Sequence, residues 1–108
     1  KDHIVNLKLP QCELNNATVS QLKNFKNLVQ LDLKNNPIED QAINTLLILE
    51  NLEVLNLVGT KITDKSFLAF QNFKNLKRIY VWQTSIKKVF IEEFNKKQDK
   101  VELIGATF

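Results

Sequence analysis

Residues 28–38 read LVQLDLKNNPI and show most clearly a pattern that recurs along the whole chain. At an offset of 24 residues the sequence aligns with itself, which adds the blocks 4–14 (IVNLKLPQCEL), 52–62 (LEVLNLVGTKI) and 76–86 (LKRIYVWQTSI). In every block the first, fourth, sixth and eleventh places are apolar. The ninth place holds a small polar residue or cysteine. A chain with 44% apolar residues would rarely keep this register by chance, so the sequence contains an internal repeat.

Each block predicts a short strand that is followed by a short helix. Apolar residues at the fourth and sixth places share one face of a strand, while the third, fifth and seventh places point to the other face. The rest of each repeat has apolar residues three apart, which predicts one inward stripe of a helix. These stripes are Val19, Leu22 and Phe25; Ile43, Leu46 and Leu49; and Phe67, Phe70 and Phe73.

Polar residues stand where the helices are expected to begin. Asn16, Asp40 and Asp64 precede the stripes by three residues, where a side-chain oxygen can cap the free amides of a helix start. In the fourth repeat Lys88 takes this place. We therefore expect the last helix to begin with a weaker cap than the others.

The ninth places form a column of small side chains that can hydrogen-bond as the chain leaves the sheet. For its first member, Cys12, we expect a small buried side chain with a weakly bonding thiol. A single cysteine excludes an internal disulfide. The column consists of Cys12, Asn36, Thr60 and Thr84.

The fourth repeat ends differently from the other three. Its apolar stripe continues as Ile91 and Phe94 but stops at Lys97. Residues 101–104, VELI, then predict a last short strand. A helix that turns polar before a terminal strand is typical of the cap that closes a solenoid.

The block pattern resembles the leucine-rich repeat, L-x-x-L-x-L-x-x-N/C-x-L. The resemblance implies an α/β fold of the ribonuclease-inhibitor-like type, a right-handed solenoid with a parallel sheet on its concave face and helices on its convex back. We expect one domain, residues 1–108, and, because the chain begins at Lys1 and lacks methionine, a fragment of a longer protein. The expected repeats are 4–27, 28–51, 52–75 and 76–100, with the capping strand in 101–108.

The outward places of the strands would line the concave face and offer a binding surface. Tyr80 and Trp82, the one tyrosine and the one tryptophan, point to this same face. Exposed aromatic side chains are typical of binding hot spots, although they can also stiffen a sheet by covering neighbouring strands. Both interpretations stay open. The candidate binding residues are Tyr80, Trp82, Arg78, Val58, Asn56, Val54, Asp32 and Lys34.

Residues 52–64 and 76–86 are also similar to the last repeats of a narrower group of proteins. These are large membrane proteins of Bacteroidetes and Planctomycetes in which a repeat tail accompanies a c-type cytochrome domain. The resemblance implies a bacterial cell-envelope protein, periplasmic or membrane-attached, with a cytoplasmic location as the alternative. It implies no haem in this chain, because covalent attachment needs C-x-x-C-H and one cysteine cannot supply it.

Other classes of function find little support in the sequence. Nothing places His3, the one histidine, near Cys12, so we expect no catalytic pair, no metal site and no cofactor. The net charge of +3 is too small to indicate nucleic-acid binding, and no apolar run is long enough to span a membrane. A basic cluster near the end either solvates the last helix or contacts an anionic surface. It consists of Lys87, Lys88, Lys96, Lys97 and Lys100.

These observations predict a non-catalytic module for protein–protein interaction or scaffolding that uses the concave sheet face. One alternative is a saccharide-binding surface, on which Tyr80 and Trp82 would stack against sugar rings. The other is a set of purely structural spacer repeats within a larger protein.

Overall fold

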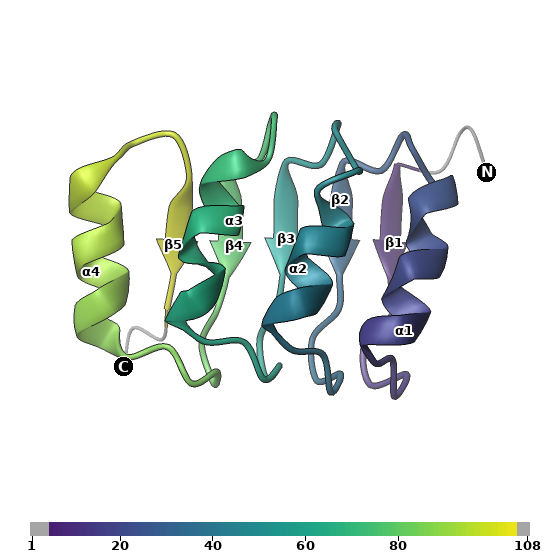
Figure 1. Cartoon of the computed structure of the whole chain (residues 1–108), viewed down its shortest axis with the longest axis horizontal. Helices are drawn as coiled ribbons and strands as arrows, with labels where there is room; N and C mark the ends of the chain where they lie inside the picture. Colours follow the sequence, from purple (N-terminus) through teal and green to yellow (C-terminus); the bar gives the residue numbers. More distant parts are fainter. Residues whose placement is uncertain (1–4, 106–108) are drawn as a thin grey trace.

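The computed structural model describes residues 5–105, which form a five-stranded parallel sheet with helical segments along one of its faces (Figure 1). The strands stand side by side in chain order. They are β1 (Asn6–Lys8), β2 (Gln30–Asp32), β3 (Val54–Asn56), β4 (Arg78–Tyr80) and β5 (Glu102–Ile104). The helical segments are α1 (Asn16–Val19), η1 (Ser20–Asn24), α2 (Asp40–Leu46), η2 (Asp64–Ser66), α3 (Phe67–Asn72) and α4 (Lys88–Lys97), of which η1 and η2 are 3₁₀ helices.

Each strand pairs with the next at the 24-residue offset that the sequence predicts. Leu7 pairs with Leu31, Leu31 with Leu55, Leu55 with Ile79, and Ile79 with Leu103. The last of these pairs confirms the strand predicted in residues 101–104. Ile4, where the first block begins, and residues 106–108 of the expected capping segment lie outside the described residues.

The fourth- and sixth-place side chains face the helical layer and form the core, as predicted. From β2 to β4 they are at most 2% exposed, and complete burial of such a side chain contributes about 1.5–3 kcal/mol. In β1, Leu7 and Leu9 are only half-buried, since the described residues place no strand beyond this edge. The buried set in the inner strands is Leu31, Leu33, Leu55, Leu57, Ile79 and Val81.

The first and third helical segments combine a short α-helix with a more tightly wound 3₁₀ helix. α1 has 4 residues before the chain tightens into η1, and η2 precedes α3. A 3₁₀ helix has about three residues per turn, so apolar side chains three apart lie directly above one another. The three-residue spacing of the stripes therefore suits 3₁₀ geometry as well as α-helix.

Asn16 and Asp40 do not cap their own helices, contrary to the prediction. Each is the first helical residue, and the N-cap positions belong to Asn15 and Glu39. Asn16 instead accepts a hydrogen bond from the Glu39 amide at 2.9 Å, and Asp40 accepts one from the Thr63 amide at 2.8 Å. From the first helical position these side chains reach the start of the next helical segment in the layer.

The start of η2 differs from the prediction in the same way. Its N-cap is Thr63, whose hydroxyl accepts a hydrogen bond from the Lys65 amide, while Asp64 is exposed in the first helical position. At α4 the N-cap is Lys87, not Lys88, and it makes no side-chain capping bond; the N-cap of α2, Glu39, makes none either, so α4 does not differ from α2 in this respect. The link between successive helix starts is therefore strongest at the middle of the molecule.

All four side chains of the ninth-place column make hydrogen bonds; Asn36 and Thr60 are buried, Thr84 is half-buried and Cys12 is exposed. Asn36 is 1% exposed, its side-chain oxygen accepts from the amides of Cys12 and Leu14, and its side-chain nitrogen donates to the Leu9 carbonyl. Thr60 donates to the Leu57 carbonyl at 2.7 Å. Cys12 is exposed, contrary to the prediction, because in the first block no described residue covers its outer side.

The eighth place of each block adopts a left-handed backbone conformation, which the sequence pattern does not reveal. The φ angles are 53° at Gln11, 60° at Asn35, 72° at Gly59 and 57° at Gln83. Left-handed backbone costs a residue with a side chain about 1–2 kcal/mol, so the turn after each strand is held by its surroundings.

Candidate functional site

We call the face of the sheet opposite the helices the open face. It carries two columns of outward side chains. Third-place and fifth-place residues share this face because they flank the inward fourth place in each strand. The register places each of these residues beside its counterpart in the next strand. The third-place column is Asn6, Gln30, Val54, Arg78 and Glu102, and the fifth-place column is Lys8, Asp32, Asn56, Tyr80 and Ile104.

Tyr80 and Trp82 meet at the end of β4. Their ring centroids are 5.7 Å apart and the ring planes are inclined by 83°, an edge-to-face contact. Both side chains are half-buried, so each offers part of its surface to a partner. The contact confirms that the two aromatic residues lie together, and it also gives them a share in the packing of this face.

In β2 and β3 the fifth-place side chain stabilises the turn that follows the strand. The Asp32 carboxylate accepts a hydrogen bond from the Lys34 amide at 3.1 Å, and Asn56 accepts one from the Val58 amide at 3.0 Å. These bonds run from residue i to residue i+2, as in Asx turns. Two candidate binding residues therefore already have a structural task.

A shallow hollow of about 150 Å³ lies on the open face beside Tyr80. Its rim carries an ammonium and a carboxylate, from Lys8 and Asp32, together with amide side chains. It is smaller than the pockets of roughly 300–1,000 Å³ that enclose small-molecule ligands. The hollow can receive one side chain of a partner, and its other polar lining residues are Asn6, Gln30 and Asn56.

The candidate residues differ in how much surface they expose. Arg78 and Lys34 are exposed, and Val54 is half-buried. Val58 is 5% exposed, which corrects the expectation that it lies on accessible surface. In the seventh-place column it stands between Lys34 and Trp82.

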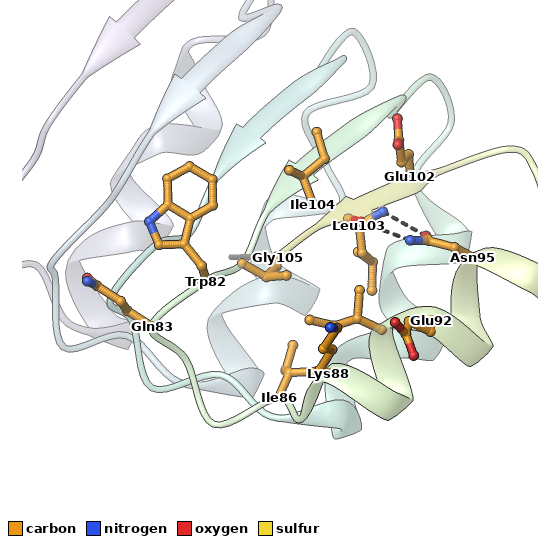
Figure 2. Close-up of a pocket in the computed structure, with 12 residues that line it drawn as sticks. Trp82, Gln83, Ile86, Lys88, Glu92, Asn95, Glu102, Leu103, Ile104 and Gly105 are labelled. Atoms are coloured by element: carbon orange, nitrogen blue, oxygen red, sulfur yellow. Dashed lines mark hydrogen bonds between the residues drawn. The ribbon is translucent and has the colours of Figure 1, made fainter. Parts of the chain in front are cut away.

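A second hollow of about 460 Å³ lies where β4 and β5 end beside α4 (Figure 2). Trp82 borders it, and Ile86 and Leu103 contribute apolar lining. In Figure 2 Trp82 and Ile104 project on the side of the sheet away from α4. Sequence reasoning missed Ile104, which pairs with Tyr80 in the register; carrying the 24-residue offset one strand further would have found it.

Three lysines of the basic cluster, Lys88, Lys97 and Lys100, lie in different surroundings. Lys88 borders the large hollow beside β5, whereas Lys97 borders a different hollow together with Phe67 of α3. Lys100 donates to the Gln71 carbonyl at 3.1 Å. These three side chains are thus distributed around the end of the molecule that α4 forms, which favours solvation over recognition of an anionic surface.

The described residues contain no group of candidate metal ligands. Within residues 5–105 no three His, Cys, Asp or Glu side chains gather as metal ligands would. His3 lies outside the described residues, so its distance from Cys12 is not part of the structure. In the described part of the chain no helix has the length and apolar character needed to cross a membrane.

A leucine-rich repeat is present in the chain. Residues 51–73, which contain β3, η2 and α3, match the family model described as Leucine Rich Repeat. Nephrocan of Mus musculus is 39% identical over 56 residues, which make up 52% of this chain and 11% of nephrocan. The chain is thus similar to a short part of that protein.

Among solved structures, that of Leiomodin-1 Actin-Binding Site 2 has a similar fold. The similarity covers 99% of this chain and 73% of that chain, with a TM-score of 0.73. Only 13% of the aligned residues are identical. The likeness therefore concerns the arrangement of strands and helices.

Proposed function

We propose that the chain is a non-catalytic protein-interaction module and that the open face around Tyr80 and Trp82 receives the partner. The observation that carries the proposal is the aromatic pair itself, half-buried and in edge-to-face contact on the face that no helix covers. Rigid aromatic side chains bury much area at a small cost in conformational entropy, which is why they are frequent anchors of interfaces.

The surroundings of the pair fit a protein partner. Exposed Arg78 stands before the pair in the same strand, and the polar hollow at Lys8 and Asp32 lies on its other side. An apolar centre with a polar rim is the usual anatomy of a protein interface. Ile104 extends the apolar centre by one strand.

The comparisons support the same class of function. A leucine-rich repeat match and the similarity to nephrocan favour a binding module over an enzyme. The similar segment of leiomodin-1 is named as an actin-binding site, so at least one protein of this fold has a protein partner. We carry over a protein partner as a class, without its identity.

We further propose that the whole chain is one leucine-rich-repeat domain of the ribonuclease-inhibitor-like type. It would have four repeats, 4–27, 28–51, 52–75 and 76–100, and a closing strand in 101–108, with the open face as the concave side. The constant 24-residue register supports this division. A location in a bacterial cell envelope rests on the resemblance of residues 52–64 and 76–86, and fractionation of the native protein with a haem stain tests it.

The function is tested by affinity capture from the source cells with three immobilised proteins. These are the wild-type chain, Trp82→Ala and Phe90→Ala, because Phe90 is an exposed aromatic residue on α4. We expect a protein that binds the wild type and Phe90→Ala but not Trp82→Ala. Equal capture by all three would contradict the proposal and favour the spacer alternative.

A saccharide-binding site is a second candidate because Trp82 borders a hollow of about 460 Å³, large enough for a small ligand. Trp82 is the one tryptophan, so intrinsic fluorescence reports on this place directly. A fluorescence change with glycans, and none with the captured protein, would favour this candidate over protein recognition.

A further inference from the structure

The backbone of β5 uses only half of its hydrogen-bonding groups to pair with β4. The Glu102 amide donates to the Lys77 carbonyl at 2.9 Å, and the Ile104 carbonyl accepts from the Val81 amide at 2.9 Å. Peptide groups alternate in direction along a strand, so the groups of Val101 and Leu103 point away from β4. These groups form the outer edge of the sheet.

Two carboxamide side chains of the helical layer occupy this outer edge. Asn95 donates to the Leu103 carbonyl and accepts from the Leu103 amide, each at 2.9 Å; Figure 2 shows both bonds. Gln98 donates to the Val101 carbonyl at 2.7 Å and accepts from the Val101 amide at 2.9 Å. Each carboxamide thus satisfies both backbone groups of one residue.

The geometry of helix and strand makes this match feasible. Asn95 bonds to the later strand residue and Gln98 to the earlier one, so the two segments run in opposite directions. Asn95 lies in the last turns of α4, whereas Gln98 is the C-cap residue with extended backbone and reaches Val101 across the short connection to β5. A carboxamide presents an N–H and a C=O side by side as a peptide group does.

The helix before α4 has no such arrangement, although the same positions exist one period earlier. Gln71 and Lys74, which precede Asn95 and Gln98 by 24 residues, are exposed, whereas Asn95 and Gln98 are half-buried. The strand that follows α3 is β4, and its outer edge is already occupied because β5 pairs with it. The carboxamides occur where a following strand is absent from the described structure.

We propose that Asn95 and Gln98 take the place of a sixth strand and keep β5 from pairing with a strand of a second copy of this chain. A free strand edge is a template for association between chains, and covering it is a known way to avoid that association. The pairing that they prevent is a backbone contact at the edge, which is separate from recognition on the open face.

Amide hydrogen exchange of the wild-type chain tests the first half of the proposal. The amides of Val101 and Leu103 should be protected to an extent similar to the Glu102 amide, which bonds to β4. Exchange of Val101 and Leu103 at the rate of an open edge would overturn the proposal, and this test requires no variant.

The double variant Asn95→Leu/Gln98→Leu tests the second half, with Gln71→Leu/Lys74→Leu as the matched control. We expect the first variant to exchange its Val101 and Leu103 amides at least tenfold faster and to form oligomers as concentration rises in sedimentation experiments. The control should remain monomeric. A monomeric first variant over the same range, or equal association of both variants, would overturn the proposal.

Discussion

The ring of Tyr80 meets the ring of Trp82 edge to face, with the centroids 5.7 Å apart. In β2 and β3 the same two places carry a different contact, a hydrogen bond from a backbone amide to the side chain of Asp32 or Asn56. In β4 the contact between the Tyr80 and Trp82 rings takes the place of that hydrogen bond. The exchange puts two large half-buried rings next to β3, whose fifth place carries the smaller polar side chain of Asn56.

Trp82→Ala should weaken partner binding while the chain stays folded. Loss of the edge-to-face contact and of partial burial should lower the free energy of unfolding by about 1–3 kcal/mol. Loss of a hot-spot side chain should cost at least about 2 kcal/mol of binding, or about 30-fold in affinity. Urea unfolding followed by circular dichroism, together with calorimetric titration of the captured partner, measures both quantities.

A loss of stability well above 3 kcal/mol, in the range typical of buried Trp→Ala changes, would instead assign Trp82 to the packing. The control is Phe90→Ala, which removes an exposed aromatic side chain from the helical layer and should leave the affinity unchanged.

Asn36→Ala should be among the most destabilising single substitutions in the chain. The asparagine is buried and joins the first turn to the second through the Cys12 and Leu14 amides and the Leu9 and Leu33 carbonyls. Buried groups that lose their partners cost about 1–3 kcal/mol each, so we expect a total of about 3–5 kcal/mol in urea unfolding. Exposed Asn44 of α2 is the control, and a similar effect of Asn44→Ala would speak against the bonding network as the cause.

Asp40→Ala and Asp64→Ala should differ strongly although the two residues are equivalent in the sequence pattern. Asp40 accepts hydrogen bonds from the Thr63 amide, from the Thr63 hydroxyl at 2.7 Å and from the Ser66 hydroxyl at 2.6 Å. Its removal should lower the midpoint of thermal unfolding, with a stability loss of about 2–3 kcal/mol. Exposed Asp64 should be replaceable without measurable change, and equal losses for both variants would be inconsistent with the link between helix starts.

Gly59→Ala should destabilise the turn after β3 for two separable reasons. Its φ of 72° costs a residue with a Cβ about 1–2 kcal/mol, and the new Cβ would overlap the side-chain oxygen of Asn35. Asn35→Ala in the same molecule removes the overlap and leaves the backbone cost. The double variant should therefore lose less stability than the sum of the two single variants, and strict additivity would exclude the overlap.

The sheet was the most predictable part of the molecule because its signal is repeated. The 24-residue offset set the strand register, and the alternation of apolar residues set the inward face of every inner strand. The sequence also predicted the end of the last apolar stripe at Lys97 and the strand after it. In the structure Ile91 and Phe94 are buried and Lys97 is exposed.

The contacts between neighbouring segments could not be predicted from residue types. Asn16 and Asp40 stand at helix starts, but a shift of one residue turns their side chains from their own helix to the next one. Val58 takes an outward place in the repeat and is nevertheless only 5% exposed. Asn95 and Gln98 look like ordinary exposed helix residues until the outer edge of β5 is known.

Site-specific photocrosslinking tests the central proposal most directly. A photoreactive residue is placed at Arg78 on the open face and, in a second protein, at Gln71 on α3; both natural side chains are exposed. The proposal predicts a crosslinked protein from position 78 that disappears when Trp82→Ala is added, and none from position 71. Crosslinks from position 71 alone, or from position 78 regardless of Trp82, would contradict it.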